Sequence, residues 1–105
     1  MQNYGYIRCR ISRGAFSSER AFSISTPSGE LEGLSDVGHL LSLNGTPLGP
    51  SLPVGSEVVE GLVKCRILQK INEELLVDLP GLDVVAVAAE DVERDVDKTF
   101  AGRWN

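Results

Sequence analysis

The feature of this sequence that most constrains its fold is a five-residue pattern that occurs twice, IRCRI around Cys9 and VKCRI around Cys65. Apolar and charged residues alternate in both copies, and a period of two is typical of a β-strand with one buried face. Both cysteines fall on the apolar side of the alternation. An unpaired cysteine in that position behaves as a small hydrophobic residue, so we expect both thiols to fill the core.

Other roles for the two cysteines stay open at this point. A disulfide requires the two strands to be neighbours, with Cα atoms within about 7 Å of each other. A metal site needs about four ligands, and the only other soft ligand in the chain is its single histidine, His39. A reactive thiol requires exposure and a lowered pKa, and aliphatic neighbours oppose both. The pattern therefore favours two buried, chemically inactive thiols.

Turn signals divide the chain into two similar sets of strands. Alternating or β-branched stretches predict six strands, at residues 6–12, 19–26, 30–35, 57–70, 75–79 and 83–91. The turns between them contain Gly, Pro, Ser or Asn. The first three strands form a meander over 5–36, and the last three form a second meander over 57–92. An internal duplication and two merely similar sets of strands both account for this pattern.

The expected fold is therefore all-β. It is a single domain over residues 1–105, a small barrel of about six short antiparallel strands, in which pseudo-symmetry can relate the two meanders. Residues 37–56 are rich in proline and glycine, which predicts a loop or linker between the meanders. In the C-terminal segment, 93–105, apolar residues recur at every fourth position, so it forms either a short helix or a tail.

The alternation also predicts which side chains are buried. The expected core residues share the apolar side of their strands: Ile7, Cys9, Ile11, Phe22, Ile24, Leu34, Val63, Cys65, Ile67, Leu75, Val77, Leu79, Val85 and Val87. Gly33 lies in the middle of the third predicted strand. A glycine there indicates a bulge or a close approach of another group to the backbone.

The balance of charge bears on partners and compartment. Residues 1–52 hold four basic and four acidic residues, whereas residues 53–105 hold six basic and eleven acidic ones, so the net charge is 6 − 11 = −5. This excess of acids disfavours nucleic acid as the main partner, and we expect a protein partner. The N-terminus lacks a basic stretch followed by an apolar run, and no apolar stretch approaches the roughly 18 residues of a membrane helix. A cytoplasmic protein without a membrane partner is expected.

The polar side of the repeated pattern provides a candidate binding face. Four cations point away from the core on the first and fourth predicted strands: Arg8, Arg10, Lys64 and Arg66. If these strands are neighbours, the four cations share one face, and Arg13 and Arg20 near the first turn extend it. Such a face either keeps the sheet soluble and protects its edges, or binds RNA or an acidic protein surface.

The sequence shows no recognisable catalytic or cofactor motif. It contains no GxSxG or SxxK nucleophile pattern and no glycine-rich phosphate-binding motif. His39 stands between a turn and an apolar pair, and the carboxylates near the C-terminus form a charge run that is typical of a solvated surface. We therefore expect no enzymatic activity, no catalytic residue, no cofactor and no metal.

One part of the chain carries a family resemblance. The sequence EGLV at 60–63 resembles the hydrophobic-Gly-x-Val opening strand of S1-type RNA-binding domains, and residues 75–81 resemble the Val- and Leu-rich strand that leads to a glycine turn in that family. The resemblance, confined to residues 55–93, implies an OB-fold barrel that stacks bases on aromatic side chains. The matching strands contain no aromatic residue. The same stretch is also similar to SH3-like barrels.

Three classes of function remain in view. The first is a non-enzymatic interaction or scaffold module, which the lack of catalytic motifs favours. The second is a small barrel that binds RNA or another single-stranded nucleic acid. The third is an enzyme or a small-ligand carrier with a site built from loops, which would be indicated by a deep pocket holding His39 with a carboxylate within hydrogen-bonding reach.

Overall fold

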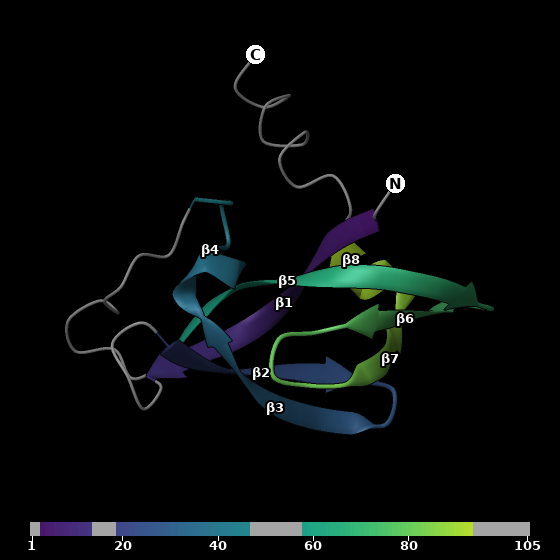
Figure 1. The fold of residues 1–105 in the computed structure, drawn as a ribbon, viewed down its shortest axis with the longest axis horizontal. Coiled ribbons are helices and arrows are strands. Elements are labelled where there is room, and N and C mark those ends of the chain that lie inside the picture. Colours follow the sequence, from purple (N-terminus) through teal and green to yellow (C-terminus); the bar gives the residue numbers. More distant parts are fainter. Residues whose placement is uncertain (1–2, 14–18, 47–57, 94–105) are drawn as a thin grey trace, which may run out of the picture.

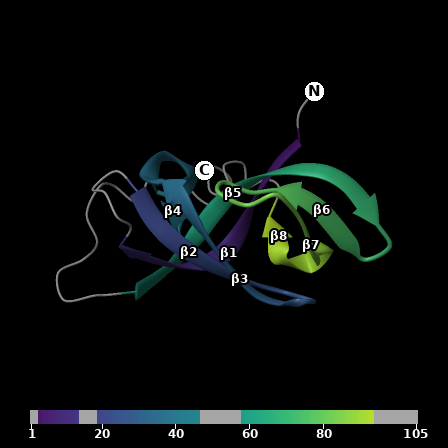
Figure 2. The ribbon, with the colours of Figure 1, turned by 60° about the horizontal axis from the view of Figure 1, so that its bottom comes forward.

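The computed structural model describes residues 3–13, 19–46 and 58–93, which form one curled antiparallel sheet. The main path of the sheet has six strands in the order β3-β2-β1-β5-β6-β7, and two further short strands pair with its centre. The sheet curls into a half-barrel, with β1 and β5 side by side through the middle (Figures 1 and 2). The all-β fold predicted from the sequence is confirmed.

The elements of the half-barrel follow one another in an order that occurs twice. Their bounds are β1 (Asn3–Arg13), β2 (Glu19–Thr26), β3 (Gly29–Asp36), the 3-10 helix η1 (Val37–His39), β4 (Leu40–Ser42), β5 (Val58–Ile71), β6 (Glu74–Asp78), β7 (Val84–Ala88), the 3-10 helix η2 (Ala89–Asp91) and β8 (Val92–Glu93). The first five elements, from β1 to β4, and the last five, from β5 to β8, are called here the first half and the second half. Each half is a three-stranded meander followed by a 3-10 turn and a short strand.

The two halves meet in the ladder between β1 and β5. Cys9 lies opposite Gly61, and Gly5 lies opposite Cys65. The same 56-residue offset relates the two pairs, because Gly61 is 56 positions after Gly5 and Cys65 is 56 positions after Cys9. The pair Ile7–Val63, also 56 apart, lies at the centre of this arrangement. The halves are also interlocked, because β4 of the first half pairs with β5 and β8 of the second half pairs with β1.

The register explains why the two cysteines do not form a disulfide. The residue opposite Cys65 is Gly5, which is four residues from Cys9 along β1. At about 3.4 Å per residue the two cysteines are about 14 Å apart, twice the Cα separation that a disulfide tolerates. Both thiols are free and buried. Burial raises the pKa of Cys9 from 9.0 to about 12 and that of Cys65 to about 11, and a backbone hydrogen bond from Gly5 opposes part of the shift at Cys65.

The interior of the half-barrel largely follows the predicted alternation. Twelve of the fourteen predicted core residues are buried, and Val85 is half-buried against the same cluster. Leu34 is the exception, because it is 49% exposed. The structure adds Leu40 from β4 to the core, and it buries Leu62 on the opposite face of β5, against Tyr6 and Leu41.

The prediction for Leu34 is wrong because of the register of β3 on β2. Leu31 pairs with Ile24 and Gly33 pairs with Phe22, so the inward positions of β3 are odd-numbered. Leu34, an even-numbered residue, points outward. A Cβ on Gly33 would lie only 2.9 Å from the Phe22 ring, so this glycine makes room for the largest side chain of the core. The close approach expected at Gly33 is confirmed.

Part of the segment predicted as a loop or linker has regular structure. Within 37–56, residues 37–42 form η1 and β4, and β4 adds a third neighbour to β5. The predicted C-terminal helix or tail at 93–105 lies outside the described residues, apart from Glu93 at the end of β8. Among the residues that the structure describes, no helix has the length and apolar character needed to cross a membrane.

Candidate functional site

The four cations proposed as a binding face lie on two adjacent strands. β1 and β5 pair along almost their whole length, and Arg8, Arg10, Lys64 and Arg66 all lie on the face that points away from the core. Arg8 and Lys64 are 56 positions apart, as are Arg10 and Arg66, so each half contributes one cation pair at matching positions. The structure thus places all four side chains on one face of the β1–β5 ladder.

The two cations of the second half are engaged with neighbouring side chains. The Nζ of Lys64 lies 4.4 Å from the centre of the Tyr4 ring, a cation–π contact across the ladder. The guanidinium of Arg66 donates to the carboxylate of Asp78 on β6, its cross-strand partner, at 3.4 Å. Both members of this ion pair are 45% exposed, so its contribution to stability is small. These contacts hold the cations in place along the sheet.

The two cations of the first half are not engaged in this way. Arg8 and Arg10 make no ion pair and no side-chain hydrogen bond with another residue in the described part of the chain. The cross-strand partner of Arg10 on β2 is Ser23, at the place where Arg66 has Asp78. The matching position thus holds a hydroxyl in the first half and a carboxylate in the second. On its other side, Arg10 lies opposite Glu60 on β5, but no ion pair links these two described residues.

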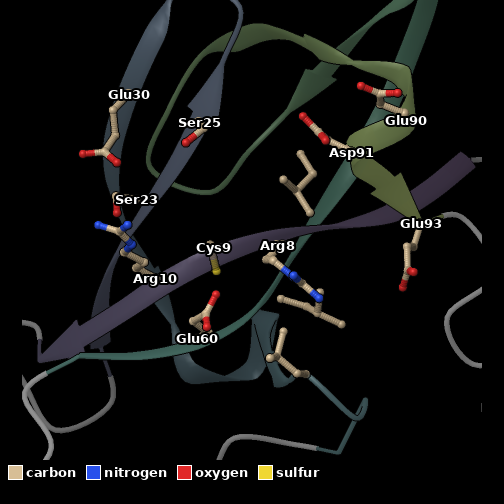
Figure 3. A pocket seen from close by; sticks show the side chains of 13 residues that line it. Arg8, Cys9, Arg10, Ser23, Ser25, Glu30, Glu60, Glu90, Asp91 and Glu93 are labelled. Carbon is tan, nitrogen blue, oxygen red and sulfur yellow. The ribbon is translucent and has the colours of Figure 1, made fainter.

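A pocket of about 550 Å³ lies beside Arg8 and Arg10. Its polar lining residues come from β1, β2, β3, β5, η2 and β8: Arg8, Arg10, Ser23, Ser25, Glu30, Glu60, Glu90, Asp91 and Glu93. Leu43 and Leu62 add apolar surface. Figure 3 shows Arg10 on the side of Ser23 and Glu30, and Arg8 on the side of Asp91 and Glu93. Five carboxylates and two guanidiniums line the pocket, which makes its lining net negative, 2 − 5 = −3.

The pocket lies where one edge of β1 has no ladder partner. On that edge, β8 pairs with residues 6 and 7, and β2 pairs with residues 10 to 13. Arg8 and Cys9 fall between them, and both line the pocket. Successive residues of a strand direct their backbone groups to opposite edges, so one of these two residues directs its N–H and C=O toward the gap. The site thus combines charged side chains with one backbone donor and acceptor.

Two other residues considered from the sequence do not belong to this face. Arg20 is buried, with 4% exposure, and its guanidinium donates to the backbone oxygen of Glu19 at 2.7 Å, so the expectation that it extends the exposed cations is wrong. His39 is exposed on η1 and does not line the pocket. Among the described residues, no group of three or more His, Cys, Asp and Glu side chains is arranged to hold a metal ion.

Sequence reasoning found the four cations but missed the residues around them. Tyr4 lies opposite Arg66, and Tyr6 lies opposite Lys64, so two aromatic rings lie on the same face as the second-half cations. The sequence contained part of this information, because the 56-residue offset between the cysteines also relates Arg8 to Lys64 and Arg10 to Arg66. The cross-strand register, which pairs Tyr4 with Arg66, depends on tertiary structure.

Comparison with known proteins adds no relative to this description. No family model matches the chain. No curated protein matches it, and no solved structure matches it.

Proposed function

We propose that this protein is a small non-enzymatic interaction module that binds a segment of another protein through the outer face of β1. The observation that carries the proposal is the contrast between the cation pairs. Lys64 and Arg66 are engaged by Tyr4 and Asp78, whereas Arg8 and Arg10 are not engaged by described residues and lie beside a pocket. Charged groups left available next to a concave surface are typical of a recognition site.

The mixed charge of the site supports a protein partner. A nucleic-acid backbone carries one negative charge per nucleotide, and its affinity depends on an excess of cations in the binding surface. Here five carboxylates line the pocket against two guanidiniums. A protein segment can present both charge signs to such a surface. The buried thiols with raised pKa and the location of His39 outside the pocket support a non-enzymatic role.

A single-stranded nucleic acid is the second candidate, and it is favoured by another part of the same face. Tyr4 is 43% exposed, and it lies on the face that carries Lys64 and Arg66. Exposed aromatic rings next to cations are the combination that single-strand binders use to stack bases and to contact phosphates. This candidate predicts binding at the Tyr4 end of the face rather than at the pocket beside Arg8 and Arg10.

Parallel selections would decide between the two candidates. The full chain is used to select from a random peptide library and from a pool of random single-stranded RNA. We expect enriched peptides that lose binding to the double variant Arg8→Gln/Arg10→Gln and keep it to the control Lys64→Gln/Arg66→Gln. Enrichment of RNA that depends on Lys64 and Arg66 would favour the second candidate. Peptides that ignore both double variants, or no enriched peptide, would contradict the proposed function.

A further inference from the structure

We propose that this chain forms a homodimer through β7, whose open edge pairs in antiparallel fashion with β7 of a second copy about a two-fold axis at Ala86. The inference goes beyond the proposed function, because none of the residues 84–88 lines the pocket beside Arg8 and Arg10. It follows from three features of the structure: the direction of the β7 backbone groups, the side chains of β7, and the protection of the opposite edge of the sheet.

The backbone of β7 has one side without a ladder partner. β7 ends the path of the sheet, and among the described residues it pairs only with β6 (Figure 1). Ala88 lies opposite Glu74, and the N–H of the next residue, Ala89, donates to the backbone oxygen of Glu73 at 2.9 Å. In an antiparallel ladder such a bond flanks a non-hydrogen-bonded pair, so Ala88 directs its own N–H and C=O away from β6. Every second residue of β7 does the same.

Two copies of this edge fit each other in a register centred on Ala86. The residues whose backbone groups point to the open edge are Val84, Ala86 and Ala88, which are symmetric about Ala86. When the two Ala86 residues lie opposite each other, each N–H donates to the other's C=O, and each Ala88 N–H donates to the C=O of Val84 in the other copy. These four hydrogen bonds leave out the Ala88 C=O, which begins the 3-10 turn η2. The result is one sheet that continues across a two-fold axis.

The side chains of β7 suit contact with a second copy. The strand reads VVAVA and contains no charge, and an edge strand without charges pairs readily with another chain. Val84 is 54% exposed, and Leu76, the cross-strand partner of Ala86 on β6, is half-buried. In the proposed register Val84 lies opposite Ala88 of the other copy on the outer face of the sheet. Pairing therefore removes apolar surface from water as well as forming hydrogen bonds.

The opposite edge of the sheet is covered by a loop. β3 ends the path on that side, and Gly81, between β6 and β7, lies against it. A Cβ on Gly81 would be 2.9 Å from the backbone nitrogen of Leu34 and would also collide with the carbonyl oxygen of that residue. The φ of Gly81 is +70°, in the left-handed region that glycine adopts without strain. A loop laid over an edge strand is one of the ways in which a sheet avoids pairing with another chain.

Charge distinguishes the two edges as well. In the ladders of the two halves, Glu32 on β3 occupies the position that Val84 has on β7. Glu30 likewise matches Ala86. Two β3 strands paired about Glu30 would place like charges opposite each other, which is destabilising. Each copy thus has one edge open to pairing, so association ends at a dimer instead of continuing into a fibre.

The first test uses the unmodified chain. Sedimentation equilibrium over a concentration series should give a species of twice the chain mass of 11.3 kDa. Amide hydrogen exchange followed by NMR should show protection at Val84, Ala86 and Ala88 that increases with protein concentration. The N–H groups of Val85 and Val87 face β6, so they should be protected at every concentration.

A charge at the two-fold axis gives the second test. Ala86→Lys places two like charges opposite each other in the dimer and should raise its Kd at least about tenfold, and Ala86→Glu should do the same. An equimolar mixture of the two variants should dimerise again, because opposite charges then meet at the axis. Glu32→Lys, at an exposed position on the β3 edge, is the control and should leave the dimer unchanged. Circular dichroism checks that each variant folds.

Several results would overturn the inference. A chain that stays monomeric at every concentration does so, as does a dimer that both charged variants retain. Assemblies larger than a dimer also overturn it, because they require a second open edge. If the chain is monomeric and the library selection yields peptides that lose binding to Ala86→Lys, the edge binds a strand of another protein and the inference is wrong. If the variants do not fold, sedimentation and hydrogen exchange of the unmodified chain decide.

Discussion

The two halves of the half-barrel place cations at matching positions but treat them differently. In the second half, Arg66 faces Asp78 on the adjoining hairpin, and Lys64 lies over the Tyr4 ring. In the first half, Arg10 faces Ser23 on β2 and Glu60 on β5, and neither Arg8 nor Arg10 has an ion pair with a described residue. The same backbone arrangement therefore carries cations with side-chain partners in one half and cations without an ion pair to a described residue in the other. The difference lies in a few side chains rather than in the fold.

The largest effects on stability are expected at two glycines of the β1–β5 ladder, Gly5 and Gly61. They occupy matching positions in the two halves but have different neighbours. A Cβ on Gly61 would lie 2.5 Å from the backbone oxygen of Leu41, whereas a Cβ on Gly5 would meet the Cγ1 of Val92 first, at 2.6 Å. A side-chain methyl can move, but the backbone of β4 can move only by losing its pairing with β5. We expect Gly61→Ala to cost about 3 kcal/mol and Gly5→Ala about 1 kcal/mol in urea unfolding. Equal losses would mean that β4 and β8 are equally tolerant.

The cysteines should show the next largest difference. A serine hydroxyl at either position is buried in an apolar core, which costs about 1 to 3 kcal/mol when no partner is present. At position 65 the Gly5 backbone, which already bonds the thiol, can bond the hydroxyl. We expect Cys9→Ser to lower the free energy of unfolding by about 2 kcal/mol and Cys65→Ser by about 1 kcal/mol. An unchanged melting temperature in both would contradict their burial.

The raised thiol pKa values predict a loss of stability at alkaline pH. Folding holds both thiols neutral, so their contribution is complete below a pH of about 9, the pKa of 9.0 of an unperturbed thiol, and is lost as the pH rises toward about 11 for Cys65 and about 12 for Cys9. At a pH of about 10 each thiol should account for about 1 kcal/mol of lost stability. The double variant Cys9→Ala/Cys65→Ala should show a shallower decline over the same range, measured by urea unfolding. Parallel curves would refute the assignment.

The smallest stability effects, and the sharpest test of the difference between halves, come from exchanging the two cross-strand residues. Ser23→Asp gives Arg10 the kind of partner that Arg66 has, and Asp78→Ser removes that partner from Arg66. Each change should alter stability by less than about 0.5 kcal/mol, because the pairs are exposed. Ser23→Asp should nevertheless weaken binding of the peptides that the library selection enriches, whereas Asp78→Ser should leave it intact. The reverse pattern in calorimetry would place the receptive site in the second half.

The long strands could be predicted from the sequence because apolar and polar residues alternate along each of them, which shows which side of the strand is buried. The strands predicted at 6–12, 19–26 and 57–70 lie within two residues of the observed β1, β2 and β5, apart from the N-terminal extension of β1 to Asn3. The short strands β4 and β8 were missed because three or two residues carry no period. They are strands only because β5 and β1 offer them an edge, which is information from tertiary structure.

The same distinction between local pattern and tertiary structure applies to the candidate site. Arg8, Arg10, Lys64 and Arg66 were predictable from alternation alone, because each stands on the polar side of its strand. The pocket was not predictable, since it depends on the gap between β2 and β8 along β1 and on the carboxylates that η2 brings to that gap. Leu34 was misplaced for a related reason. Its side follows from the pairing of β3 with β2, whose register cannot be read from β3 itself.

The exchange of short strands between the halves has a consequence for how the molecule unfolds. Neither half is complete without the other, because β4 covers an edge of β5 and β8 covers an edge of β1. A fragment ending after β4 or starting at β5 would retain its hairpins but lose the longest ladder of the sheet. Denaturation should therefore proceed as one cooperative transition. Refolding should be slow for a chain of this size, because contacts so distant in sequence must form before the gain in stability appears.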